Sequence, residues 1–478
     1  MRALATRGLP TVDNPGLGLL VLAPLAALLV GAAFSFDARA GVALTLSLIY
    51  LGVALHNLPL ALILWCPLIF LEGLPEFNLA AKAGGLLIVA VWLAGLSRTR
   101  EHVDSVLRRT GKLWLAVVVL LLWLSLTLLW AENRGLVLDD LWRWFAVALL
   151  MLVIATTVSN RRQATLMAAA FVVGAVMAVG VGIVSGDLTT SRTAIETASE
   201  GRLEGGQGDP NALAAGIVPA MILALALFMS HRDFAVRWLL VAALALLTLG
   251  LVASESRGGV LAAIAATFAA LLVFRDRRAS ALAFVTLTVG VAAAWFAVSP
   301  NAWERVTDFD SGGSGRSDLW AVAWNVAEAS PIEGVGLHNF TAVSGEYVRQ
   351  PGSLERVDLV VDEANFVHNV YLELLAETGL IGLLLFVGVA AGSAHTAWRA
   401  ARQFDASGDA TMKTLAQAVV VALVGLLTSS FFLSSGVDKR LWIVFGLSPA
   451  LLAIAARQQR DHHAEDGGGG APRSALGR

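Results

Sequence analysis

Long apolar runs dominate this sequence of 478 residues and constrain its fold more than any other feature. About 20 apolar residues are enough for a helix to cross the ~30 Å hydrocarbon layer of a bilayer. Only 15% of the residues are charged, whereas soluble domains contain about 25%. We therefore predict an all-α, polytopic membrane bundle of about 12–14 transmembrane helices with one large, partly helical extracytoplasmic loop.

Fourteen runs are candidate spans. The second and third are short, so they form either two crossings or one re-entrant pair, which would leave twelve crossings. Glycine and alanine within the spans are expected to allow close helix packing. The predicted spans are residues 17–34, 41–55, 58–71, 79–96, 113–130, 141–158, 164–185, 211–229, 234–251, 258–274, 281–298, 380–398, 415–432 and 441–456.

Basic residues gather in five connections between spans, and this asymmetry orients the chain. Lys and Arg in short loops mark the cytoplasmic side of a membrane, and all five connections face it when the amino terminus is cytoplasmic. Both termini are then inside, and the connections 131–140, 187–210, 254–257 and 299–369 face outward. The basic residues are Arg98, Arg100, Arg108, Arg109 and Lys112; Arg161 and Arg162; Arg232 and Arg237; Arg275, Arg277 and Arg278; and Arg399 and Arg402.

The segment 299–369 is the one sizeable polar stretch that interrupts the apolar runs. Its Trp, Phe and Tyr residues argue against disorder, and loops of this size are usually functional. We interpret it as the lid and reaction site of a membrane enzyme, between an N-terminal bundle (1–298) and C-terminal transmembrane helices (370–456). The glycine-rich end, 457–478, is predicted to be a disordered cytoplasmic tail.

Several kinds of chemistry have no support in the sequence. A net charge of −2 without a basic domain gives no indication of nucleic-acid binding, and the single cysteine, Cys66, excludes an intramolecular disulfide. Walker-type phosphate loops, dinucleotide glycine motifs and His-Glu-x-x-His are absent. Asp308-Phe309-Asp310 has the spacing found in metal-dependent sugar transferases, but an acidic loop produces such a triplet by chance. We predict no metal site and no cofactor.

The first candidate anion site is Ser254-Glu255-Ser256-Arg257-Gly258-Gly259, at the outer start of the span 258–274. A helix start presents free N–H groups and a positive dipole end, which attract anions. Arg257 adds a forked guanidinium suited to phosphate oxygens, and the glycines allow a ligand close to the backbone. Arg257, Ser256 and Gly258 are therefore candidate ligand contacts. The alternative is that Arg257 extends to lipid headgroups.

A second arginine of this kind is Arg316, which follows Gly312-Gly313-Ser314-Gly315. Ser317 is predicted to cap a helix from about residue 318 to 329, which Pro331 ends. Arg316 would then also lie at a helix start, and two such arginines suit a diphosphate. The alternative is a salt bridge from Arg316 to an aspartate of the same loop, Asp308, Asp310 or Asp318.

His368 is the candidate proton acceptor, because an imidazole titrates near pH 6.5. The alternative is a structural histidine at a helix start. In a helix that begins at His368, Tyr371 lies on the same face, whereas Glu373 and Glu377 point roughly 140° and 180° away. We therefore predict no catalytic triad and expect Glu377 to tie the helix to a neighbour or to bond backbone groups before Gly379.

A further outward connection runs from Arg202 to an Asp-Pro-Asn turn before the span 211–229. Asn211 is expected to cap that span, and the alternative is that it faces the cavity. We include Arg202 and Asn211 among the candidate substrate contacts.

These motifs, in this order, resemble the O-antigen ligase and polymerase superfamily of bacterial membrane glycosyltransferases. Each motif is weak alone, but all are expected on the outward face. The resemblance covers roughly residues 201–382 by motif and the whole chain by topology. The segments that carry it are Asp209-Pro210-Asn211-Ala212-Leu213-Ala214, Ser256-Arg257-Gly258-Gly259, Gly315-Arg316 followed by Trp320, Pro331-Ile332-Glu333-Gly334-Val335-Gly336 with Phe340, and His368-Asn369 through Glu377-Thr378-Gly379.

The resemblance implies an enzyme of the bacterial inner membrane that moves a glycan from a polyprenyl diphosphate carrier to a glycolipid or glycan acceptor without metal. By this analogy Arg257 and Arg316 hold the diphosphate and His368 acts near the acceptor hydroxyl, with Trp320, Asn369 and Tyr371 as further substrate contacts. His338 has no counterpart in the family pattern and is interpreted as loop structure. The ligases are expected to have twelve spans.

We expect an inverting O-antigen ligase or a related surface-polysaccharide enzyme. A polymerase that extends lipid-linked repeat units is an alternative, because the donor chemistry is the same. A transporter or flippase is a further alternative, but it would be expected to carry ionisable residues near mid-membrane, and the span interiors here are nearly free of charge.

Overall fold

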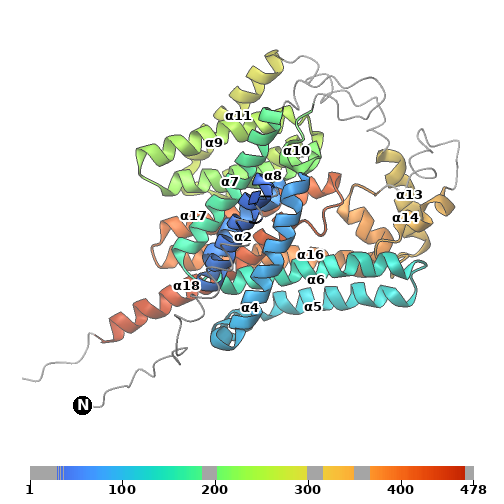
Figure 1. Cartoon of the computed structure of the whole chain (residues 1–478), viewed down its shortest axis with the longest axis horizontal. Helices are drawn as coiled ribbons and strands as arrows, with labels where there is room; N and C mark the ends of the chain where they lie inside the picture. Colours follow the sequence, from blue (N-terminus) through green and yellow to red (C-terminus); the bar gives the residue numbers. More distant parts are fainter. Residues whose placement is uncertain are drawn as a thin grey trace, which may run out of the picture. The chain divides into compact units, whose positions relative to one another are not determined.

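The computed structural model describes residues 37–185, 202–298, 316–348 and 366–468, together with residues 30, 32, 34 and 35. Over these residues the chain forms α-helices and 3-10 helices and no strand, which confirms the all-α prediction (Figure 1). It divides into two compact units, Met1–Ala61 and Leu62–Arg478. The first unit contains α2 (Ala38–His56), and the second contains every candidate site residue.

The long helices after α2 follow one another with short connections, except between α7 and α8 and between α11 and α16. They are α4 (Pro75–Arg109), α5 (Gly111–Leu126), α6 (Arg134–Thr157), α7 (Arg161–Ser185), α8 (Pro210–Ser230), α9 (Phe234–Ala253), α10 (Arg257–Val273), α11 (Arg278–Val298), α16 (Val370–Ala406), α17 (Ala410–Ser429) and α18 (Lys439–Gly468). Shorter elements are α3 (Leu58–Trp65), η1 (Cys66–Leu71), η2 (Thr127–Leu129), η3 (Gly205–Gln207), η4 (Arg275–Arg277), α13 (Arg316–Ala329), α14 (Phe340–Val343), η6 (Ser344–Tyr347) and η8 (Ser430–Phe432).

Ten helices within the described ranges are long and apolar enough to cross a membrane. The predicted spans 41–55 and 58–71 differ from each other: α2 has 19 residues, whereas α3 and η1 are short because Pro67 lies at the start of η1. The predicted span 258–274 corresponds to α10, which has 17 residues. The predicted span 17–34 lies almost wholly outside the described residues.

One predicted connection is helical, and so is the first part of the predicted tail. The basic connection after the span 79–96 is part of α4, which continues to Arg109 before α5 begins at Gly111. The predicted disordered tail begins within α18, which continues past Arg457 to Gly468. Both segments are rich in Arg, Gln or Glu, which favour helices once one has been started.

Helices α8 and α18 form the centre of the bundle. In the most apolar stretch of each, 89% of the residues are buried, whereas the figure is 11% for the stretch formed by η4 and α11. Small residues allow the neighbours of α8 to approach closely, as expected. A Cβ atom on Gly425 of α17 would lie 2.7 Å from Val218 of α8, and one on Gly250 of α9 would lie 3.2 Å from Ile217 of α8.

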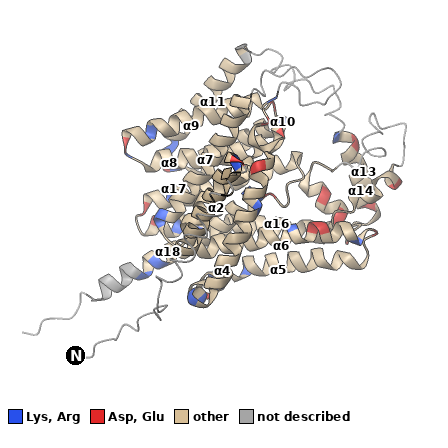
Figure 2. Cartoon of the chain, viewed as in Figure 1, with Lys and Arg blue, Asp and Glu red and all other residues tan. Residues whose placement is uncertain are grey.

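The predicted cytoplasmic connections meet at one end of the bundle. Lys413 pairs with Asp276 (2.6 Å) and Asp405 (2.9 Å), and Arg161 pairs with Asp409 (3.0 Å). These pairs join the connections before α7, α11 and α17. Figure 2 shows charged residues gathered toward the ends of the long helices and few along their length. That this end faces the cytoplasm remains a prediction from the basic residues.

The predicted outward connections meet at the other end. The Asn133 N–H donates to Asn339 Oδ1 (2.7 Å), and Trp130 Nε1 donates to the Gly334 carbonyl (3.1 Å). The Leu203 N–H donates to the Ala253 carbonyl (2.9 Å). The end that carries the candidate site is thus held together by bonds between segments distant in the sequence.

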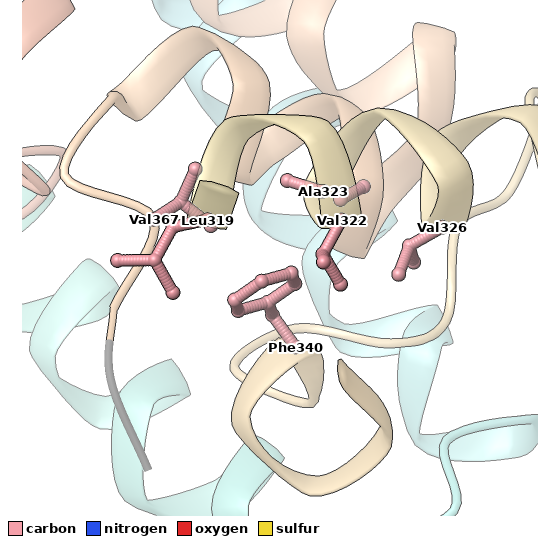
Figure 3. Close-up of a cluster of buried hydrophobic side chains, with 7 residues drawn as sticks. Leu319, Val322, Ala323, Val326, Phe340 and Val367 are labelled. Carbon is pink, nitrogen blue, oxygen red and sulfur yellow. The ribbon is translucent and has the colours of Figure 1, made fainter. Parts of the chain in front are cut away.

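The described part of the long polar loop is partly helical and has a small core of its own (Figure 3). One face of α13 packs on Phe340 of α14 and on the start of α16. The buried residues of this core are Leu319, Val322, Ala323, Val326, Phe340, Val367 and Ala376. The segments 299–315 and 349–365, including Asp308 and Asp310, lie outside the described residues.

Candidate active site

The start of α10 has the geometry expected of an anion-binding helix end. Ser256 is the N-cap, and its Oγ accepts the Gly259 N–H (3.2 Å), while Arg257 is the first helical residue. The two glycines have a packing role: Cβ atoms added to Gly258 and Gly259 would lie 2.7 Å from Phe432 and 2.6 Å from Ala214. An added side chain would point into protein at both positions, so close helix packing explains why glycine stands there.

A hydrogen-bond network joins the starts of α8 and α10. Ser256 Oγ donates to Asn211 Oδ1 (2.8 Å), and Arg202 Nη2 donates to the same oxygen (3.2 Å). Arg202 Nε also donates to the Ser254 carbonyl (2.9 Å). The expectation that Asn211 caps α8 is wrong. Asp209 is the cap, accepting the Ala212 N–H at 2.6 Å, and this leaves the Asn211 amide to face α10.

Arg316 is the first residue of α13, so Ser317 is the second residue of that helix and not its cap. Burial lowers the pKa of the Arg316 guanidinium; the Asp209 carboxylate raises it and the Arg257 charge lowers it. Arg316 at the start of α13 therefore lies within electrostatic reach of Arg257 at the start of α10 and of Asp209. Guanidinium groups keep their charge at neutral pH.

His368 belongs to the same group of charges. Burial lowers the pKa of its imidazole below the usual 6.5, the Arg316 charge lowers it further, and Asp209 raises it. The imidazole is therefore neutral at pH 7, as a proton acceptor requires. The structure thus brings together Arg257, Arg316 and His368, which are widely separated in the sequence.

His368 precedes α16 and is not part of it. Its φ of +54° lies in the left-handed region, which side chains other than glycine rarely adopt, and its N–H donates to Ser434 Oγ (3.1 Å). Asn369 is the N-cap and accepts the N–H groups of Tyr371 (3.0 Å) and Leu372 (3.1 Å). Because His368 lies outside α16, the helical geometry used to place Glu373 and Glu377 relative to His368 does not apply.

Trp320 and Tyr371 fix the segment that carries His368. Trp320 Nε1 donates to the Val367 carbonyl (3.0 Å), and the Tyr371 hydroxyl donates to the Leu427 carbonyl (2.7 Å). Their polar groups are thus bonded to backbone, as is the Asn369 side chain. Their positions fit residues that orient His368.

Glu377 bonds a neighbouring segment, as predicted. Its carboxylate accepts the backbone N–H of His338 (2.8 Å) and of Phe340 (3.3 Å). Two residues later Gly379 interrupts the helical φ/ψ of α16 with φ +67°, and the Leu380 N–H donates to the Pro331 carbonyl (2.9 Å). The motif around Pro331 and the motif around Glu377 are therefore bonded to each other.

The sequence analysis missed Asp209 as a charge near His368 and missed the pair Asp438–Arg440. Arg440 Nη2 contacts Asp438 Oδ2 at 2.6 Å, and its Nη1 donates to the Ala212 carbonyl (2.7 Å), in the first turn of α8. Charged residues directly before the span 441–456 were the available signal.

Over the described residues, no three His, Cys, Asp or Glu side chains are arranged to hold a metal ion.

Comparison with protein families identifies residues 241–387, about a third of the chain, as matching the O-antigen ligase family. This part of the chain is therefore similar to the O-antigen ligase family. The matched region runs from within α9 to within α16 and so contains Arg257, Arg316 and His368. Among the curated proteins none matches.

The similarity to O-antigen ligases and the ten long apolar helices of the described residues together indicate a multi-pass membrane protein. They support a membrane glycosyltransferase broadly of the O-antigen ligase or polymerase type, which acts in polysaccharide biosynthesis. The resemblance drawn from the sequence motifs is confirmed at the level of the superfamily.

Proposed function

We propose that the protein transfers a glycan from a polyprenyl diphosphate to a glycolipid or glycan acceptor at the outer face of the bacterial inner membrane. The observation that carries this proposal is the electrostatic proximity of Arg257, Arg316 and His368. Two cations at the starts of two helices suit two phosphate groups, and a neutral imidazole beside them suits a hydroxyl that must lose a proton.

In the proposed reaction the acceptor hydroxyl oxygen attacks the anomeric carbon of the donor from the face opposite the diphosphate. The new C–O bond forms as the bond to the diphosphate oxygen breaks, so the configuration inverts. The electron pair leaves with the polyprenyl diphosphate, whose growing negative charge Arg257 and Arg316 stabilise without a metal ion. The hydroxyl proton passes to His368.

The surroundings of His368 support its role as base or orienting group. Its left-handed backbone is retained by bonds on both sides: Val367 to Trp320, and the His368 N–H to Ser434. Strained backbone is commonly found where a side chain must be held in a functional position. A positioned general base contributes about 10²–10⁴ in rate.

The direct test is reconstitution of the purified full-length protein in bilayers with a synthetic polyprenyl diphosphate glycan and a panel of acceptors. We expect glycosylated acceptor and free polyprenyl diphosphate in equal amounts, unchanged by a chelator of divalent cations. No transfer to any lipid A-core or lipid-linked acceptor would contradict the proposal, and transfer abolished by the chelator would contradict its metal independence.

We propose ligation as the physiological reaction, with polymerisation as the second candidate. Lipid-extracted glycans from a strain that lacks the protein separate the two. Loss of polymer from the outer-membrane glycolipid with accumulation of lipid-linked polymer indicates a ligase. Accumulation of single lipid-linked repeat units indicates a polymerase.

A further inference from the structure

A cavity adjoins the backbone of the His368 segment. It has a volume of about 130 Å³ and is lined by residues that include Asp140, Arg143, Glu373, Glu377 and Ser434. A water molecule needs roughly 10–15 Å³ measured in this way, so the cavity has room for one sugar unit rather than an oligosaccharide. None of the charged residues in this set belongs to the proposed diphosphate site.

The carboxylates of this cavity are held in place by protein donors. Asp140 Oδ2 accepts Trp144 Nε1 (3.0 Å), and Glu377 accepts two backbone N–H groups, from His338 and Phe340. A carboxylate has about four lone-pair sites, so Asp140 retains acceptor capacity for a ligand, whereas both oxygens of Glu377 already accept a backbone N–H. Fixed acceptors with unused capacity suit a ligand that brings several hydroxyl donors.

The rest of the lining favours a sugar over an ion. Over the described residues the acidic and imidazole groups do not converge in threes as a metal site requires. Arg143, whose side chain is 53% exposed, supplies donors, and the aromatic rings of Trp144 and Phe366 supply apolar surface. Directional polar groups beside apolar surface are typical of small-molecule sites, and a pyranose presents hydroxyls at its rim and C–H groups on its faces.

The cavity adjoins the segment that carries the proposed base. Ser434 lines it and accepts the His368 N–H (3.1 Å), and Phe366 and Val370 on either side of His368 line it too. An acceptor sugar bound there adjoins the chain segment that carries the proposed proton acceptor.

We propose that this cavity binds the acceptor, through hydrogen bonds from the hydroxyls of one sugar unit to Asp140 and Glu373. That the bound sugar belongs to the acceptor rests on the proposed function. That the cavity binds a sugar does not depend on the proposed function. Glu377 is left out of the ligand contacts because its carboxylate is needed for the two backbone N–H groups.

Sugar binding is tested without any transfer reaction. The full-length protein in nanodiscs is mixed with methyl glycosides of common hexoses, hexosamines and heptoses, and saturation transfer from protein to sugar is measured by NMR. We expect a signal for at least one glycoside, lost in Asp140→Asn and in Glu373→Gln and retained in Arg316→Ala. Absence of a signal in the wild type, or its retention in both cavity variants, would overturn the assignment.

The acceptor role is tested by kinetics in the reconstituted assay. Glu373→Gln and Asp140→Asn are expected to raise the acceptor KM roughly tenfold, by loss of a hydrogen bond to a carboxyl oxygen, and to leave the donor KM unchanged. The control is Glu346→Gln, the same substitution at an exposed position of η6. Equal increases in both KM values, or no increase in the acceptor KM, would contradict the proposal. Failure of wild-type transfer would contradict the proposed function and leave the NMR result to decide sugar binding.

Discussion

The Ser256 hydroxyl donates a hydrogen bond to Asn211 Oδ1, with 2.8 Å between the two oxygen atoms. This bond joins the start of α10 to the start of α8. The same oxygen accepts Arg202 Nη2. One amide oxygen therefore fixes three segments beside Arg257. It couples the position of the proposed diphosphate-binding arginine to the helix that Asp209 caps.

Asn211→Ala is expected to destabilise this end of the bundle and to reduce transfer. The substitution leaves the Ser256 hydroxyl and Arg202 without their shared acceptor, at a cost of about 1–3 kcal/mol. Asn211→Asp keeps an acceptor oxygen and adds a charge opposite Arg202, so it should retain most of the stability. Thermal unfolding and initial transfer rates provide the measurement. Equal unfolding midpoints for the alanine variant and the wild type would show that the network contributes nothing.

The pH dependence of transfer reports on His368. Its pKa is lowered below 6.5 by burial and by Arg316, while Asp209 raises it. Transfer should therefore persist below pH 6.5 and fall only as the pH drops through this lowered pKa. In Asp209→Asn the raising influence is lost, so the acidic limb should move to still lower pH; asparagine can still cap α8.

The pH experiment compares kcat/KM profiles of the wild type and Asp209→Asn in the reconstituted assay. A limb that moves to higher pH in the variant would contradict the electrostatic relation between Asp209 and His368. Loss of the limb in an active His368→Gln variant would assign it to the imidazole.

Glu377→Ala is expected to lower the free energy of unfolding by several kcal/mol. It leaves the N–H groups of His338 and Phe340 buried without acceptors, at about 1–3 kcal/mol each. Glu346→Ala, on the exposed surface of the same polar loop, should change stability by less than about 0.5 kcal/mol. Comparable losses in the two variants would argue against the bond network around Glu377.

Gly379→Ala should prevent accumulation of folded protein. Gly379 has φ +67°, and a Cβ atom there would lie 2.0 Å from the Ile332 carbonyl oxygen, a contact that no side-chain rotation relieves. Gly388→Ala is the matched control in the same helix, because a Cβ atom there meets nothing within 4 Å. Fluorescence-detected gel filtration of the two variants gives the comparison. Normal accumulation of Gly379→Ala would contradict the geometry of the kink.

Local sequence signals were sufficient for the helix starts. The apolar run 258–274 predicted that a helix begins beside Arg257, and the predicted start of the helix after Arg316 was within two residues of that observed. The carboxylate of Glu377 was expected to bond backbone groups, and it does. Such features depend on residues a few positions apart, which a sequence displays directly.

Contacts between distant segments were beyond the reach of the sequence. Pro210 suits the first helical position and so favours Asp209 as the cap of α8, but no local signal shows that Ser256 and Arg202 bond to Asn211. Likewise, the sequence shows Asp438 and Arg440 as charged residues before a span, but it does not show that Arg440 donates to the Ala212 carbonyl of α8.

The central claim is that Arg257, Arg316 and His368 act together on one diphosphate-bearing donor. The most direct measurement is donor binding and transfer by the reconstituted variants Arg257→Ala, Arg316→Ala and His368→Ala, with the exposed Arg232→Ala as control. We predict that the two arginine variants lose donor affinity and transfer, whereas His368→Ala binds donor and transfers roughly 10²–10⁴ times more slowly. Wild-type donor affinity and near-normal transfer in both arginine variants, with normal accumulation, would contradict the claim.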